Sequence, residues 1–71
     1  MEINAKSTDR KLLLELTGEL DHRGAAQAIR ELELALDAAL PLHLALDFSG
    51  VTFMDSSGIA LILRARRRMQ T

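Results

Sequence analysis

Apolar and polar residues follow two different periods along this chain, and the first part shows the period of strands. An apolar run that ends at Leu16 predicts a largely buried strand over residues 11–16. This strand is expected to end at Thr17-Gly18. Residues 2–6 are expected to pair beside it through a polar turn at residues 7–10.

The next segment changes to the period of an amphipathic helix, because its apolar residues recur every three or four positions. Asp21 is expected to cap the start of this helix. Pro41 is expected to end it, since the residue before a proline is pushed out of the helical region. The predicted helix covers about residues 22–39. Its apolar stripe consists of Ala25, Ile29, Leu32, Leu36 and Ala39 or Leu40.

The last part of the chain returns to a strand pattern and then to a helix. Leucines at every second position of residues 42–47 predict a strand with its leucines buried. Ser49-Gly50 is expected to turn the chain, residues 51–54 form a second apolar segment, and residues 57–69 are expected to form a helix. The order β-β-α-β-α predicts one α/β domain over residues 1–71, a small mixed sheet with its helices on one face.

Composition narrows the class of protein. With 48% hydrophobic residues, two Phe and no Trp or Tyr, the core of this 71-residue chain is expected to be aliphatic. The absence of Cys excludes disulfides and thiolate sites and favours a cytoplasmic protein. The first residues lack the pattern of a signal peptide. The longest apolar run, Ile59–Leu63, is far shorter than the roughly 20 residues that cross a bilayer, so no membrane partner is expected.

Charge gives no sign of a nucleic-acid partner, because the net charge is −1. Cations are favourable at the carboxyl end of a helix, so solvation of that end explains the one basic cluster of the chain. Binding of a phosphate group is the alternative. The cluster consists of Arg64, Arg66, Arg67 and Arg68.

The segment Asp55-Ser56-Ser57-Gly58 places two hydroxyls and a carboxylate where a strand gives way to a helix. Free backbone N–H groups are expected to gather at such a helix start. A kinase is expected to reach a hydroxyl there, and the helix end would accommodate the added phosphate. A plain N-cap is the alternative, because Asp and Ser are preferred caps.

Enzymatic readings find less support in the sequence, and no cofactor, metal or catalytic residue is assigned. The nucleophile elbow G-x-S-x-G of hydrolases and the P-loop of nucleotide-binding proteins are both absent. The candidate metal ligands are Asp47, Asp55, His22 and His43, and their spacing matches no known ligand motif. A catalytic triad could be formed from the residue types Ser56, His22 and Asp21, but the sequence motif that positions such a nucleophile is absent.

Two further motifs stand in order before the D-S-S-G segment: L-T-G-E-L-D over residues 16–21 and L-D-F-S-G-V-T-F-M over residues 46–54. Together the three motifs resemble the STAS domain, specifically the bacterial anti-sigma-factor antagonists. The resemblance runs from about Leu12 to Leu63, which is most of the chain.

The resemblance implies a set of site residues. It places phosphorylation on Ser56, and it identifies Ser57 as the neighbour expected to cap the helix. The loop that carries G-E-L-D is implied to lie near the phosphorylation site and to form part of the partner surface. The implied partner-binding residues are Gly18, Glu19, Leu20, Asp21, Asp55, Ser57 and Gly58.

The resemblance also implies a function. Unphosphorylated, the chain would bind an anti-sigma factor with serine kinase activity and free a sigma factor. Phosphorylation of Ser56 would end that binding, and a serine phosphatase would restore it. The alternatives are a STAS-like subunit of a lipid-transport or anion-transporter complex, which exchanges no phosphate, and a truncated fragment without function.

Length is the departure from the family. Its members usually continue past the second helix with at least one more strand and helix, which this sequence lacks. In the predicted helix over residues 57–69, apolar residues spread over more than one side. A homodimer or larger oligomer is therefore expected.

Overall fold

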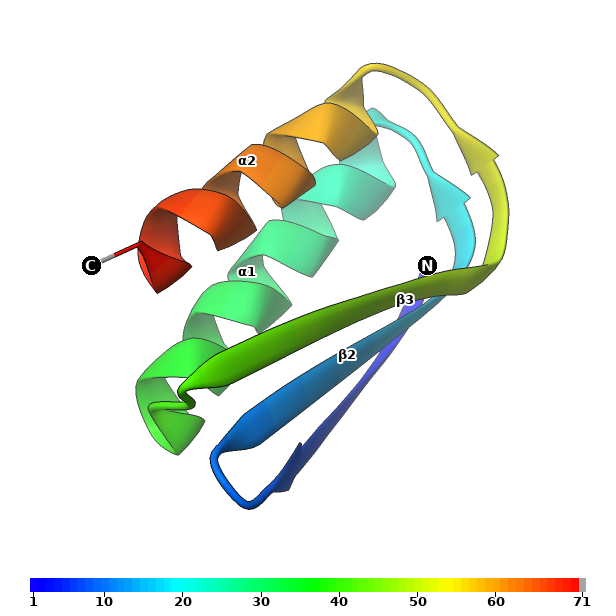
Figure 1. The fold of residues 1–71 in the computed structure, drawn as a ribbon. Helices are drawn as coiled ribbons and strands as arrows, with labels where there is room; N and C mark the ends of the chain where they lie inside the picture. Colours follow the sequence, from blue (N-terminus) through cyan, green and yellow to red (C-terminus); the bar gives the residue numbers. More distant parts are fainter. Residues whose placement is uncertain (71) are drawn as a thin grey trace.

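The computed structural model describes residues 1–70, so Thr71 of the expected domain lies outside it. Three strands form one sheet in the order β1-β2-β3, and both helices cover the same face of this sheet (Figure 1). The predicted order and the small mixed sheet are confirmed. The elements are β1 (Glu2–Thr8), β2 (Lys11–Leu20), α1 (His22–Ala39), β3 (His43–Met54) and α2 (Ser57–Met69).

The strands β1 and β2 form an antiparallel hairpin with a shorter turn than the predicted residues 7–10. Only Asp9 and Arg10 lie between the strands, with φ of 51° and 64°. Two successive positive φ angles characterise the two-residue turn whose twist matches that of the flanking strands. The hairpin therefore pairs up to Thr8 with Lys11.

The strands β2 and β3 are parallel, and both continue beyond their predicted ends. The predicted ends at Thr17-Gly18 and at Ser49-Gly50 were wrong. Both dipeptides lie inside strands, where the pairing shifts register twice and so absorbs two extra residues of β3. Residues 51–54 are therefore the last part of β3, not a separate segment.

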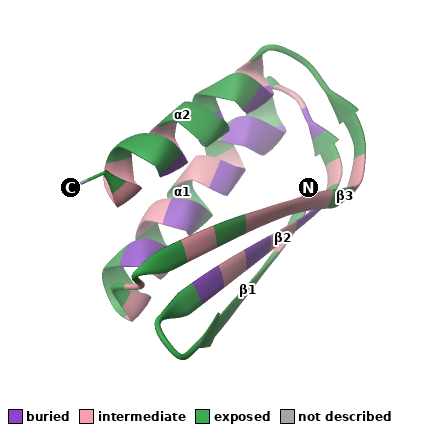
Figure 2. Ribbon diagram, viewed as in Figure 1, coloured by how far each residue is buried: buried purple, intermediate pink, exposed green. Residues whose placement is uncertain are grey.

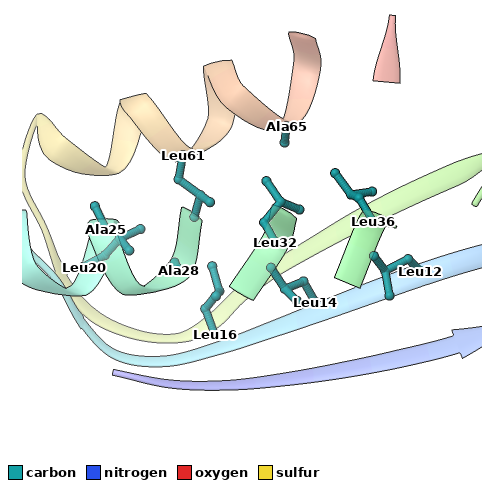
Figure 3. Packing of buried hydrophobic residues seen from close by; sticks show 10 residues of the cluster. All are labelled: Leu12, Leu14, Leu16, Leu20, Ala25, Ala28, Leu32, Leu36, Leu61 and Ala65. Atoms are coloured by element: carbon teal, nitrogen blue, oxygen red, sulfur yellow. The ribbon is translucent and has the colours of Figure 1, made fainter. Parts of the chain in front are cut away.

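The core lies between the sheet and the two helices (Figure 3). Alternate leucines of β2 point toward the helices, as a strand with one covered face requires. Figure 2 shows buried residues in β2 and in both helices. One predicted core residue was wrong: Leu42 precedes β3 and is 61% exposed. The buried hydrophobic residues are Leu12, Leu14, Leu16, Leu20, Ala25, Ala28, Leu32, Leu36, Leu61 and Ala65.

The predicted limits of α1 are confirmed. The side chain of Asp21 accepts a hydrogen bond of 2.8 Å from the N–H of Gly24, which satisfies one of the free donors at the helix start. At the other end, Leu40 adopts a left-handed conformation with φ of 46°, directly before Pro41. Its N–H still donates to the carbonyl of Leu36.

The basic cluster of α2 serves the packing of the two helices in part. Arg68 lies 3.0 Å from a carboxylate oxygen of Glu33 and 2.7 Å from one of Asp37, and both acids belong to α1. Arg64 lies 3.8 Å from Glu33. The bond to Asp37 raises the pKa of Arg68 further above its ordinary value. Helix-end solvation therefore describes only part of this cluster.

Candidate functional site

The first residues of the two helices lie together at one edge of the sheet (Figure 1). This follows from the topology, because the parallel strands β2 and β3 end at the same edge and each leads into a helix. Leu20 pairs with Met54 at this edge. The structure thus brings Asp21, which follows β2, near Asp55 and Ser56, which follow β3.

The first backbone N–H groups of α2 donate hydrogen bonds to acceptors of the two residues that precede the helix. The N–H of Ser57 donates to Oδ1 of Asp55 at 2.8 Å. The N–H groups of Gly58 and Ile59 donate to the carbonyls of Asp55 and Ser56, each at 3.1 Å. The expectation of free N–H groups at this helix start was therefore wrong for these three residues.

Ser56, and not Ser57, occupies the N-cap position of α2. The expected cap at Ser57 was wrong, because this residue is the first of the helix. Ser56 has helical backbone angles, φ −63° and ψ −18°, and its side chain makes no capping hydrogen bond. Ser56 is exposed, whereas Ser57 is half-buried. The hydroxyl of Ser56 is thus accessible and is not needed to hold the helix.

The first three residues of the G-E-L-D motif form the end of β2 and its aspartate caps α1, so the expected loop was wrong. Gly18 has φ of 111° at one of the register shifts. Beyond it, Glu19 is exposed and Leu20 is wholly buried in the core. Asp21 is half-buried and caps α1. Glu19 therefore reaches the surface and Asp21 does so in part, at the end of the sheet where Ser56 follows β3, whereas Leu20 does not.

Gly58 also belongs to the packing and not to the surface. It is buried, and a Cβ atom built on it would lie 2.5 Å from Cγ of Met54 and 3.1 Å from Cδ2 of Leu20. The small residue lets the first turn of α2 approach the ends of β2 and β3 closely. A role of Leu20 or Gly58 at a partner surface would therefore be indirect, through the shape of this corner.

Large exposed apolar side chains lie at the end of β3 and along α2, before and after the candidate site in the sequence. The sequence predicts the part of this apolar surface that belongs to α2, because the apolar residues of positions 57–69 spread over more than one side of a helix. The sequence does not predict the contribution from β3, because the apolar pattern of residues 51–54 indicates no buried or exposed side. The exposed side chains are Phe53, Met54, Ile59, Ile62 and Leu63.

Residues 1–70 contain no second cluster of side chains arranged for metal binding or catalysis. No three metal-ligating side chains of this part lie close enough to hold an ion. Asp21 bonds to Gly24, and no hydrogen bond among these residues links it to His22 or Ser56. Two surface hollows of about 310 and 840 Å³ are lined by sheet residues, and neither includes Ser56. Neither helix of this part is long and apolar enough to cross a membrane.

Comparison with known proteins points to one family. The family described as "Mlab, STAS domain" matches residues 3–71. An anti-sigma F factor antagonist of Lysinibacillus sphaericus is 30% identical over 63 residues, which cover 89% of this chain and 54% of the relative. The protein of the same name from Paenibacillus polymyxa is 35% identical over 52 residues, which cover 73% of this chain and 44% of that relative.

Solved structures agree with this result. The anti-sigma factor antagonist SpoIIAA of Bacillus, in its unphosphorylated and phosphorylated forms, matches with a TM-score of 0.76 and 27% identity. The match to the unphosphorylated form covers 97% of this chain and 64% of SpoIIAA. This chain spans about half the length of the curated relatives that it matches.

Proposed function

Since the chain belongs to the STAS domain family, we propose that it is an anti-sigma-factor antagonist switched by phosphate on Ser56. Unphosphorylated, it binds an anti-sigma factor that has serine kinase activity, and a sigma factor is released. The kinase then phosphorylates Ser56 and binding ends, until a serine phosphatase removes the phosphate. The chain itself contributes no catalytic residue and needs no cofactor.

The observation that carries the proposal is the state of Ser56. Its residue is exposed at the start of α2, and its side chain makes no capping hydrogen bond. The bond from Ser57 to Asp55 holds the helix start instead. A phosphate on Ser56 therefore changes the charge of the surface without removing a bond that the fold needs.

The switch acts through charge. A phosphate adds about −1.5 to −2 at neutral pH. The nearest N–H groups of α2 already have acceptors, so the helix start offers the phosphate little compensation. Asp55 and Glu19 are exposed at the same sheet edge and add negative charge. A partner surface that fits the unphosphorylated edge must then desolvate and repel a dianion, which weakens binding.

Phosphate transfer tests the site. The chain is incubated with ATP and the kinase-type anti-sigma factor of its own organism, and the phosphate is located by mass spectrometry. One phosphate on Ser56 is expected, none on Ser56→Ala, and normal transfer to the control Ser57→Ala. Phosphate found on Ser57 would overturn the assignment.

Binding tests the switch. Ser56→Ala is expected to bind the anti-sigma factor like the wild type, because its hydroxyl makes no capping bond. Ser56→Asp is expected to bind more weakly, although it carries less charge than a phosphate. Equal affinity of the three proteins would contradict the mechanism. A stable complex without any phosphate transfer would favour a permanently docked STAS-like subunit instead.

A further inference from the structure

The helix α2 has an inner and an outer face of different kinds. Leu61 and Ala65 point into the core. Because a helix advances 3.6 residues per turn, the residues opposite them share the outer face. Ile59 and Leu63 lie on this outer face, with exposed fractions of 52% and 54%, and Ile62 lies on its flank, about 100° from Leu61, with 40%. The outer side of α2 is largely exposed in Figure 2.

Charge is distributed unequally along this outer face. Asp55 precedes the apolar residues, and Arg66 and Arg67 follow them. All three are exposed. Glu33 of α1 pairs with two other arginines of the helix, Arg64 and Arg68, whereas no carboxylate of residues 1–70 pairs with Arg66 or Arg67. The face is therefore acidic at its start, apolar in its middle and basic at its end.

Two copies of this outer face have complementary charges only when the two helices run antiparallel. Two copies of the face in parallel would place Asp55 beside Asp55 and the arginines beside each other. In an antiparallel contact centred at position 61, each residue lies opposite one that is equally far on the other side of the centre. This sets Asp55 against Arg67, Ser56 against Arg66, and Ile59 against Leu63.

We infer that the outer face of α2 binds a second copy of this chain, antiparallel and about a two-fold axis. Every apolar residue of the face then meets the apolar part of the partner copy, and each charged end meets the opposite charge. A contact of this kind leaves the sheet and the core unchanged. If Ser56 is the switch proposed above, the dimer also covers it, so self-association and the kinase compete. The dimer itself does not depend on that function.

Sedimentation of the purified chain tests the surface. The wild type is expected to change from monomer to dimer as its concentration rises. Leu63→Glu and Arg67→Glu should each raise the dissociation constant about tenfold or more. Leu34 is 68% exposed on α1, so Leu34→Glu provides a matched control that should dimerise like the wild type. Circular dichroism of each variant shows whether it is folded.

Cross-linking tests the direction of the contact. The chain has no cysteine, so every engineered thiol is unambiguous. An oxidised mixture of Ile59→Cys and Leu63→Cys is expected to give much more cross-linked dimer than either variant alone, because these positions face each other across the axis. Mixtures of either variant with Leu34→Cys serve as the control and should give little.

Three results would overturn the inference. A monomer at all concentrations would show that a second copy does not cover this face, and binding of the anti-sigma factor to it would then identify another occupant. A dimer that Leu63→Glu leaves intact would place the contact elsewhere. Equal cross-linking of all cysteine pairs would reject the antiparallel arrangement. None of these results depends on phosphate transfer, so they do not decide the proposed switch.

Discussion

Two segments of β3 and its continuation share the pattern Asp-x-Ser-Gly, at residues 47–50 and 55–58. In both, the aspartate accepts a 2.8 Å hydrogen bond from the N–H of the serine two residues on. This bond is typical of an aspartate that shapes a local turn. The first segment nevertheless stays within a strand, and the second begins a helix.

The neighbouring strand explains the difference. Asp47 and Gly50 both pair with residues of β2, so the extra residue between them is taken up as a register shift. The last pair of the two strands joins Leu20 to Met54, so the second segment lies beyond the end of β2. Its backbone is free to turn, and Ser56 is left exposed. Local sequence thus sets the hydrogen bond, and the neighbouring strand decides what the chain does next.

The largest expected effect on stability is that of replacing Gly50 in the first segment, compared with Gly58 in the second. A Cβ atom on Gly50 would lie 2.8 Å from Oγ1 of Thr17 and 2.9 Å from the carbonyl oxygen of Leu16. Because the latter is backbone of a paired strand, it cannot move without breaking the ladder. Gly50→Ala is expected to lower the free energy of unfolding by about 2 kcal/mol or more, measured by urea denaturation. A neutral substitution would show that the strands are not packed this closely.

A second experiment compares the two helix starts. Asp21 makes a capping bond to Gly24, and Ser56 makes none. Asp21→Ala is expected to cost about 1 kcal/mol, and Ser56→Ala less than about 0.5 kcal/mol, in the same denaturation assay. Equal losses would mean that the hydroxyl of Ser56 also caps its helix.

The same Asp21→Ala protein tests the partner surface. Asp21 is half-buried at the same end of the sheet as the proposed switch, so we expect its loss to weaken binding of the anti-sigma factor by more than the fall in stability accounts for. Calorimetry with folded protein measures this affinity. Intact binding together with the full loss of stability would reduce Asp21 to a helix cap.

Gly58→Ala is expected to have a smaller effect than Gly50→Ala. The atoms that its Cβ would meet most closely belong to the side chain of Met54, which is 49% exposed and can move aside. Alanine also favours the helix over glycine by about 0.5–1 kcal/mol. The net loss should therefore be about 1 kcal/mol or less, and Met54→Ala in the same chain should reduce it. A loss as large as that of Gly50→Ala would remove the distinction between the two segments.

The smallest effect concerns acid stability. Hydrogen bonds from the backbone and the hydroxyl of Ser49 lower the pKa of Asp47 below its ordinary value of 3.8. The stability that this carboxylate contributes is full above the unfolded pKa and is lost as pH falls through the lower folded pKa. Asp47→Asn keeps an oxygen acceptor and does not titrate. Below about pH 4, its melting temperature should fall less steeply than that of the wild type. Identical slopes would contradict the shift.

Much of the candidate site was readable in the sequence. The order of the motifs placed Ser56 after a strand and before a helix, and the parallel strands bring Asp21 to the same edge. The cap at Ser57 and the free N–H groups were wrong because local preference allows either serine to cap. In the structure the side chain of Asp55 accepts the N–H of Ser57, so the aspartate supplies the capping bond and neither serine does.

The sequence by itself determined the order of the elements, the limits of α1 and the burial of Leu12, Leu14 and Leu16 in β2. These depend on periodicity and on local capping, which act within a few residues. Tertiary structure alone decided that Ser49-Gly50 continues a strand, that Leu20 is buried, and that Arg68 pairs with two acids of α1. Each of these depends on a group from a distant part of the chain, and periodicity carries no information about which distant groups will meet.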